Sequence, residues 1–424
     1  MSVQKIDIAP GVDGYYIENT RFNTTLLTYN FYFPLNAKKM ATNALLPFLL
    51  TSCNEEYRDY IDLNIGLLEI YGADLSCSVS KSGDLFHVKI GINVINNNLA
   101  LENDMPVNKA AALVSDLIFA PALEDAGFIE EDIKREKRKT IERIQGEINN
   151  KKSYARTRLF EEMFGADPYG KFIYGSVDEV EAITGGQLYN AWLELLATAY
   201  VRINVIGNEY PEEVFAQAKE KFAALNRSFS PDILKSGINL EQVDTPRDIT
   251  ERFNVTQGKI AMGFTSETKG SLKTAAALSL FSDIFGGGPY SKLFENVREK
   301  QSLCYYCSAV SRRNKGFVTV ESGVEEQNAQ KTIDAVLKEL SDMQNGIFDD
   351  STVDASKKAI TDSLYGYYDN ANAIDIWYSR EIKEELSPEE AAEIVMNVTR
   401  EDVIKAAKGV KLHTIYRLMP KEGM

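Results

Sequence analysis

Along the first half of the chain, the spacing of apolar positions alternates between a period of two and a period near three and a half. The first period predicts strands, and the second predicts amphipathic helices with one buried face. Strands are predicted at 20–35, 73–82, 84–95 and 200–207, and helices from Thr42 and at 57–71, 109–119, 130–149, 154–164 and 187–197. This order of elements is typical of an α/β unit.

The second half of the chain repeats the same order. Strands are predicted at 259–266, 302–311, 316–324 and 412–418, and helices from Leu272, at 291–300, 328–344, 350–367 and 388–396, and from Arg400. Individual segments also match between the halves at offsets close to 215–220 residues, about half of the chain: 127–141 with 346–360, and 182–196 with 397–410. The pattern therefore indicates a duplication.

From this duplication we predict a fold of the α/β (α+β) class with two domains. Each domain is expected to be a mainly antiparallel sheet packed against helices. The expected domains are 1–226 and 247–424, joined by the polar, helix-poor linker 227–246.

Composition narrows the possible functions. The formal net charge of −15 argues against nucleic-acid binding, because an acidic surface repels phosphates. The longest apolar run, 44–53, is broken by Pro47 and is too short to span a membrane. The N-terminus lacks the basic and apolar regions of a signal peptide, and four cysteines do not make a disulfide framework. We expect a cytoplasmic protein without a membrane span.

Cysteine and histidine are the residues to weigh for redox and metal chemistry. Cys304 and Cys307 form a C-x-x-C, but the predicted strand points them to opposite faces, which favours structural thiols over a redox or zinc site. The chain has two histidines, His87 and His413, in predicted strands of different halves. A zinc site with two histidines on one helix is therefore impossible.

Several segments together resemble the pitrilysin/insulysin superfamily of zinc peptidases, in particular its half-size bacterial members and the subunits of mitochondrial processing peptidase. They are GLLEIYGADLSCSVS from Gly66, DPYG from Asp167, YGS from Tyr174, and FGGG from Phe285 followed by SKLF and VREK. These segments occur in the family's order and span nearly the whole chain. The resemblance implies two domains facing each other as half of a clamshell.

Active members of that family carry H-x-x-E-H on the first long helix, where the histidines bind zinc and the glutamate is the general base. By position this motif falls on 47–51, where Pro47 and Thr51 replace the histidines and Leu50 replaces the base. The glutamate ligand of the later helix falls on Glu142 or Arg143. The resemblance thus implies a non-catalytic member that binds no metal or other cofactor, with zinc expected only in a partner subunit.

The second domain of active members supplies an arginine and a tyrosine, with six residues between them, that hold the substrate backbone. Arg298 and Tyr305 match this arrangement. Guanidinium and phenol groups can donate to peptide carbonyls or to an oxyanion. The glycines of the preceding turn, Gly286, Gly287 and Gly288, allow a close approach of substrate backbone or form a helix stop. The other interpretation of Arg298 and Tyr305 is inherited structure.

One further element of active relatives is a strand that pairs with the substrate, here 74–80. Ser76, Cys77 and Val79 depart from the Asn-Ala-x-Thr run of the family, so the sequence does not decide whether a substrate pairs with this strand.

We therefore expect a non-catalytic, substrate-binding subunit of a heterodimeric zinc peptidase that acts on peptides or unfolded chains. A paralogous subunit with H-x-x-E-H would supply the zinc, and this chain alone is expected to have no metallopeptidase activity. The alternatives are a structural protein, like the core proteins of the respiratory bc complex, and a peptide-binding protein that acts alone.

Overall fold

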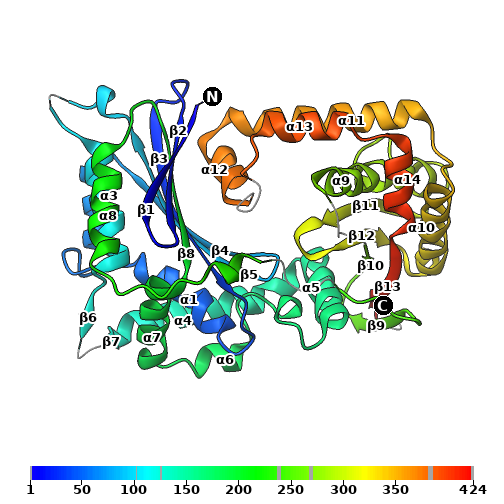
Figure 1. Cartoon of the computed structure of the whole chain (residues 1–424). Coiled ribbons are helices and arrows are strands. Elements are labelled where there is room, and N and C mark those ends of the chain that lie inside the picture. Colours follow the sequence, from blue (N-terminus) through cyan, green and yellow to red (C-terminus); the bar gives the residue numbers. More distant parts are fainter. Residues whose placement is uncertain are drawn as a thin grey trace. The chain divides into compact units, whose positions relative to one another are not determined.

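The computed structural model describes residues 2–101, 103–124, 127–235, 240–266, 271–380 and 385–421 (Figure 1). It divides into two compact units, and each is assembled from three segments of the chain. Unit 1 comprises Met1–Gln145, Ile173–Lys235 and Tyr367–Glu385, and unit 2 comprises Gly146–Phe172, Ser236–Gly366 and Leu386–Met424.

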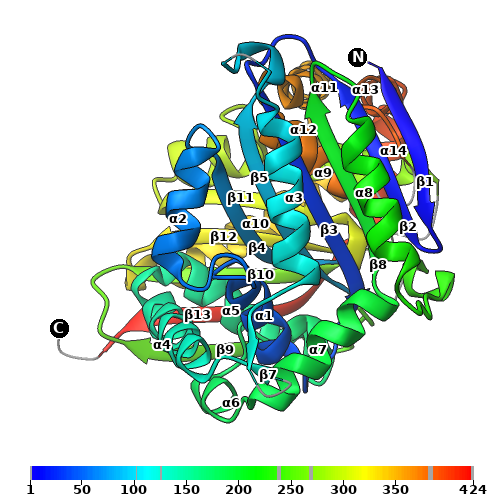
Figure 2. The same ribbon diagram turned by 90° about the vertical axis from the view of Figure 1, so that its left-hand side faces the viewer.

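Unit 1 contains a six-stranded sheet in the order β1-β2-β8-β3-β5-β4 (Figure 2). The strands are β1 (Val3–Ala9), β2 (Val12–Glu18), β3 (Thr24–Pro34), β4 (Asp74–Ser82), β5 (Leu85–Ile95) and β8 (Tyr200–Gly207). All neighbours are antiparallel except β2 and β8, which run parallel. A short hairpin, β6 (Leu123–Glu124) and β7 (Gly127–Phe128), lies outside this sheet.

One face of the unit 1 sheet carries the hydrophobic core. Alternate residues of β3, such as Leu27, Tyr29 and Phe31, point to this face and pack in one buried cluster with the helices. The helices of this unit that carry buried apolar residues of that cluster are α1 (Met40–Leu50), α2 (Tyr60–Glu69), α3 (Pro106–Phe119), α4 (Glu130–Gly146), α6 (Val177–Glu181), α7 (Gly185–Thr198) and α8 (Glu212–Ala223).

The opposite face of this sheet is polar and is covered by α12 (Ala371–Arg380), which Figure 1 shows on the other side of the strands from α3 and α8. The buried carboxylate of Asp375 accepts hydrogen bonds from Thr28 Oγ1 (2.5 Å) and Asn204 Nδ2 (2.9 Å). It also pairs with Lys89 Nζ at 2.6 Å. The helix is therefore held by matched polar groups, because a buried charge needs partners.

Unit 2 repeats the plan of unit 1. Its strands are β9 (Arg247–Phe253), β10 (Gly258–Thr265), β11 (Cys304–Arg312), β12 (Phe317–Val324) and β13 (Lys411–Pro420). The order β11-β12-β10-β13-β9, with only β13 and β9 parallel, matches the order β4-β5-β3-β8-β2 of unit 1. The predicted duplication and fold class are confirmed.

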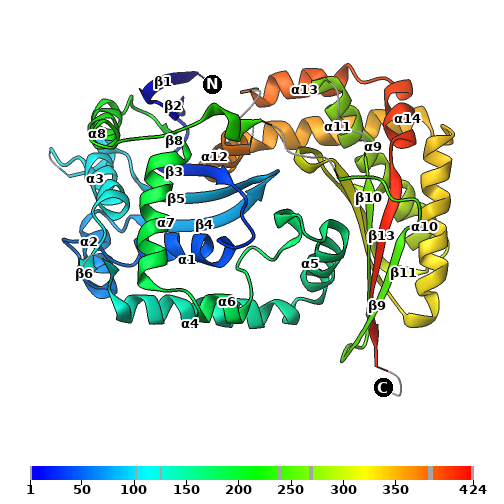
Figure 3. The same cartoon turned by 60° about the horizontal axis from the view of Figure 1, so that its bottom comes forward.

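Helices cover both faces of the unit 2 sheet, with α5 on one side and α10 on the other (Figure 3). The helices of this unit are α5 (Lys151–Phe164), α9 (Leu272–Gly286), α10 (Ala329–Gln344), α11 (Asp350–Tyr365), α13 (Pro388–Met396) and α14 (Arg400–Lys408). Ala155 and Leu159 of α5 are buried against Ala261, Tyr416 and Leu418 of the sheet.

The compact units differ from the contiguous domains 1–226 and 247–424 at two helices. Helix α5 precedes the linker but packs in unit 2, and α12 follows it but packs in unit 1. Periodicity predicts an apolar face for α5, but it does not predict which sheet receives that face. Of the five boundaries between the units along the chain, the one at Lys235/Ser236 falls inside the predicted linker 227–246. Residues 236–239 of this linker lie outside the described residues.

Besides α12, the sequence pattern did not predict the strands β1, β2, β6, β7 and β9 or the helices α6 and α8. Three of them, β1, β2 and β9, lie at or next to a sheet edge, and β1 and β9 have many exposed positions. Within the described ranges, no helix combines the length and apolar character that crossing a membrane requires.

Candidate functional site

The positions of the zinc motif lie at the end of α1. Pro47 is inside the helix and buried, and Leu50 is fully buried in the core of unit 1. Thr51 follows the last helical residue; its hydroxyl donates to the Pro47 carbonyl oxygen at 2.9 Å, and its Oγ1 lies 3.3 Å from Cys77 Sγ. The end of α1 is thus occupied by packing and internal hydrogen bonds.

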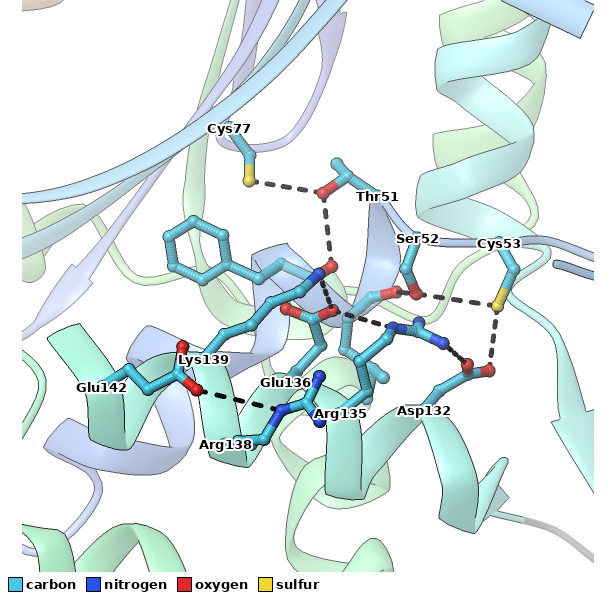
Figure 4. Close-up of polar contacts among 12 residues, drawn as sticks. Thr51, Ser52, Cys53, Cys77, Asp132, Arg135, Glu136, Arg138, Lys139 and Glu142 are labelled. Carbon is cyan, nitrogen blue, oxygen red and sulfur yellow. Dashed lines mark hydrogen bonds and ion pairs between the residues drawn. The ribbon is translucent and has the colours of Figure 1, made fainter. Parts of the chain in front are cut away.

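Helix α4 provides the two residues considered for the fourth ligand. The Glu142 side chain is 67% exposed, and its Oε1 lies 3.9 Å from Arg138 Nε on the same helix (Figure 4). The Arg143 guanidinium instead stacks on α1, with its Cζ 4.2 Å from the centroid of the Phe48 ring. It also lies 5.6 Å from the Tyr174 ring. Of the two residues, Arg143 is the one at this end of α1.

Two buried acidic residues of α4 lie two and three turns before Arg143. The Glu136 Oε1 atom accepts from Lys139 Nζ (2.8 Å) and Arg135 Nε (3.2 Å), as Figure 4 shows. Asp132 pairs with Arg135 and accepts from the Cys53 thiol at 3.3 Å. Both carboxylates are neutralised by cations of the same helix, because an unpaired buried charge is costly.

These residues do not fit a zinc site. Pro47 and Leu50 offer no donor atom, Thr51 offers a hydroxyl that is already hydrogen-bonded, and Arg143 offers only N–H groups. In the described part of the chain, no group of three or more His, Cys, Asp or Glu residues is arranged to hold a metal ion.

Both histidines have partners within the sheets. His87 of β5 stacks on Tyr32 at 4.5 Å and hydrogen-bonds through Nε2 to Asn30 Oδ1 at 2.9 Å. Burial lowers its pKa to about 4. His413 of β13 is buried and hydrogen-bonds to Thr414 Oγ1, and burial lowers its pKa as well. The prediction that the two histidines lie in strands of different halves is confirmed.

Arg298 lies on a π-helix, Leu293–Glu299, that the sequence pattern predicted only as a short helix. The Lys300 N–H donates to the Glu295 carbonyl oxygen at 2.9 Å, one residue further back than in an α-helix. The Arg298 side chain is 41% exposed, with Nε 3.4 Å from Glu299 Oε1 and its guanidinium over the Phe294 ring. Short π-helical turns occur often at functional sites, since they change the direction of side chains.

Tyr305 lies at a β-bulge near the start of β11. Cys304 pairs with Val324 and Tyr306 with Gly323, so Tyr305 is an additional residue in the edge strand. Its ring is 56% exposed, and its hydroxyl donates to Glu325 Oε1 at 3.2 Å. This hydrogen bond raises the pKa of Tyr305, so the phenol stays protonated and able to donate. Sequence reasoning missed the bulge, because the local pattern is that of a regular strand.

The same bulge corrects the interpretation of the C-x-x-C. Cys304 and Cys307 do not point to opposite faces, because the additional residue changes the register: the two pair with Val324 and Ser322, which are two residues apart on β12 and share a face. Both are free thiols.

The glycine-rich turn has one internal and two outer members. Gly286 is buried at the end of α9, where a Cβ atom would lie 2.5 Å from the Ala309 backbone nitrogen. Only glycine allows this approach of α9 to β11. Gly287 is exposed and Gly288 is half-buried, and both follow the end of the helix. Gly286 therefore has a packing role, and a substrate contact would fall to Gly287 and Gly288.

The comparisons with known proteins agree with this picture. The family model described as "Peptidase M16 inactive domain" matches residues 182–360. M16 denotes the family of the pitrilysin-type peptidases. The chain is a homologue of the M16 peptidases. The resemblance to the pitrilysin-type peptidases is confirmed by this match, and the loss of the zinc motif by the residues at 47–51, which do not fit zinc.

Relatives of this M16 homologue extend over its whole length. It is 28% identical over 415 residues to the "probable inactive metalloprotease YmfF" of Bacillus subtilis, and the match covers 97% of both chains. A conserved protein from Enterococcus faecalis has the same fold with a TM-score of 0.90 and 25% identity, over 100% of this chain and 99% of that one. The peptidase M16 inactive domain from Pseudomonas fluorescens shares the fold, with a TM-score of 0.79, 18% identity and 99% coverage of both chains.

Proposed function

We propose that this M16 homologue is the non-catalytic, substrate-binding subunit of a heterodimeric zinc peptidase. A paralogous subunit with H-x-x-E-H supplies the zinc and the general base, and this chain binds the peptide through Arg298 and Tyr305. The observation that carries the proposal is the exposure of these two side chains. Arg298 contacts the carboxylate of Glu299 through Nε and has further N–H donors for a peptide, whereas the single O–H of Tyr305 donates to Glu325 and would have to exchange this exposed partner for a peptide carbonyl.

The chemistry of Arg298 and Tyr305 suits an extended peptide. A guanidinium offers five N–H donors in a fixed plane, and the phenol adds one more. Beside a zinc-bound carbonyl, the same donors would stabilise the negative charge that develops on oxygen. The substrate class is therefore a peptide or an unfolded chain whose backbone carbonyls are accessible.

An exposed apolar face on α2 supports a protein partner. Ile61, Ile65 and Leu68 follow one another at helical spacing, and Leu68 is 72% exposed. Contiguous exposed apolar residues of this kind mark protein interfaces. We assign this face to the contact with the zinc-bearing subunit, as part of the same proposal.

Reconstitution tests the proposal directly. Three preparations are compared under the same zinc concentration: this chain, an H-x-x-E-H paralogue from the same genome, and the two mixed or co-expressed. We expect a stable complex, with hydrolysis of an unstructured fluorogenic peptide by the complex and little or none by either chain alone. A complex whose activity equals that of the paralogue alone would indicate the structural alternative. No complex, together with peptide binding by this chain, would indicate the stand-alone alternative.

A further inference from the structure

Unit 1 contains a small cavity where α1 and α7 pack together beside the sheet (Figure 3). Its volume is about 170 Å³. The apolar part of its lining includes Phe33 of β3, Leu46 of α1, Val88 of β5 and Leu195 of α7. A cavity of about 150 Å³ with a lining of this kind holds benzene, so this one is large enough for a branched aliphatic group and the atoms next to it.

One buried polar side chain also lines this cavity. Asn43 of α1 is only 8% exposed, and its backbone N–H donates to the Lys39 carbonyl oxygen at 2.9 Å. Its side-chain amide has no hydrogen-bond partner among the protein groups that the structure describes. Buried amides are normally hydrogen-bonded, because burial without a partner costs free energy. Asn43 therefore offers two N–H donors and one carbonyl acceptor to a polar group inside the cavity.

Charges of both signs lie at the rim of the cavity. Lys39, the N-cap residue of α1, and Glu194 of α7 line it with side chains that are 46% and 51% exposed. The Lys39 Nζ and Glu194 Oε2 atoms are 2.5 Å apart. This contact occupies one of the three N–H donors of the ammonium and one oxygen of the carboxylate. The pair can therefore still bind one anionic and one cationic group of a ligand.

We propose that this cavity binds a free apolar α-amino acid of about the size of leucine. The aliphatic side chain packs against the apolar lining, the α-carboxylate binds Lys39 and an N–H of Asn43, and the α-ammonium donates to Glu194. A zwitterion brings one charge of each sign to a rim that has one charge of each sign. A carboxylate or an amine alone would face one residue of like charge without the matching attraction.

This site does not depend on the proposed peptidase role. All of its residues belong to unit 1, and Arg298 and Tyr305 belong to unit 2. Binding of an amino acid can therefore be measured on the chain by itself, and its failure would leave the proposal about a zinc-bearing partner unaffected.

The test is a ligand-observed NMR titration of the full-length chain at pH 7 with L-leucine as the probe. We expect saturable binding with a Kd on the order of 1 mM, since a ligand this small makes few contacts. Three analogues each lack one part of leucine. We expect 4-methylpentanoate, without the ammonium, and 3-methylbutylamine, without the carboxylate, to bind at least about fivefold more weakly. Glycine, without the side chain, should bind at least about tenfold more weakly.

The analogues also define the results that would overturn the proposal. No saturable binding of leucine would mean that the cavity holds only water. Binding of 4-methylpentanoate or 3-methylbutylamine as tight as that of leucine would refute recognition of a zwitterion. Binding of glycine as tight as that of leucine would refute the role of the apolar lining.

Variants locate the binding in this cavity. Ala191→Leu adds a larger side chain to the lining and should abolish binding. Lys39→Met and Glu194→Gln should each weaken it about fivefold. Lys221→Met is the matched control, because Lys221 and Asp116 form an ion pair at 3.1 Å with similar exposure elsewhere in unit 1. If Ala191→Leu does not fold, the charge variants decide: unchanged affinity for leucine in both would contradict the proposal.

Asn43→Ala separates a role in binding from a role in folding. Losing one buried hydrogen bond to a charged group should weaken leucine binding about tenfold. Because the Asn43 amide has no protein partner among the described residues, this variant should melt at a temperature no lower than that of the parent chain. A lower melting temperature together with unchanged leucine binding would assign Asn43 to the fold and contradict the proposal.

Discussion

The two duplicated units differ in whether the residues at their candidate functional positions are still accessible. In unit 1, the end of α1 is closed: Leu50 is fully buried, Thr51 is hydrogen-bonded to its own helix, and Arg143 stacks on Phe48. In unit 2, Arg298 and Tyr305 remain partly exposed, on a π-helix and a β-bulge respectively. At the end of α1, ordinary side-chain packing occupies the positions of the zinc ligands. In unit 2, by contrast, Arg298 and Tyr305 lie on irregular backbone that leaves them partly exposed.

This difference separates two kinds of functional loss. A metal site fails when any ligand is replaced by an apolar or cationic side chain, since zinc requires a complete set of donors. Donors that bind a peptide backbone need only exposure and direction. Unit 2 can therefore keep a binding role after unit 1 has lost the residues for metal chemistry.

The substitution with the largest expected effect is at Leu50, and it tests whether this position of the zinc motif is now part of the hydrophobic core. Leu50→Glu would bury a carboxylate with no partner, so we expect the free energy of unfolding to fall by about 4 kcal/mol. Leu50→Met, which nearly conserves volume, should cost less than about 1.5 kcal/mol. Urea denaturation measures both. A Leu50→Glu variant that is as stable as the parent chain and binds zinc would show that the position is still open.

The pH dependence of stability tests the structural role assigned to His87. Its pKa is about 4 in the folded chain and near 6.5 when unfolded, so the unfolded state binds more protons between these values. Stability should therefore be full above pH 6.5 and fall by up to about 3 kcal/mol as the pH drops towards 4.

The His87→Gln variant should remove this slope, and His413→Gln should retain most of it. Denaturant midpoints measured across this pH range decide the point. An unchanged slope in His87→Gln would assign the acid sensitivity to other groups.

A smaller loss of stability is expected when Arg143 and Glu142 of α4 are each replaced by alanine. Arg143→Ala removes a cation from the faces of Phe48 and Tyr174 and should cost about 0.5–1 kcal/mol. Glu142→Ala removes only an exposed ion pair and should cost less than about 0.5 kcal/mol. Equal losses in thermal unfolding would contradict the inward placement of Arg143.

Much of the fold was predictable because the chain is strongly patterned. The order of strands and helices in both halves, and their duplication, follow from apolar spacing, and α10 and α13 begin and end within one residue of prediction. The strands β1 and β9 and the helix α12 were missed. Their residues alternate weakly, and α12 is held by polar contacts such as Asp375 with Thr28.

The candidate site was predictable by residue type more than by geometry. Pro47, Leu50 and Thr51 show from the sequence alone that the zinc ligands are absent. Which of Glu142 and Arg143 faces α1 depends on how α4 is rotated about its axis, and this is seen only in the structure. The bulge at Tyr305 and the shared face of Cys304 and Cys307 depend on strand register, which a single sequence does not specify.

The central claim is that unit 2 still supplies donors to a partner's reaction. Its most direct test is the peptidase activity of the reconstituted complex that carries Arg298→Ala or Tyr305→Phe, with assembly verified by size-exclusion chromatography. Removing an oxyanion-type donor costs about 2.7–4 kcal/mol, so turnover should fall about 100-fold or more in each variant. Arg138→Ala and Tyr365→Phe, which change exposed residues of the same types elsewhere, should leave turnover unchanged. Full activity in an assembled complex with both Arg298→Ala and Tyr305→Phe would contradict the account.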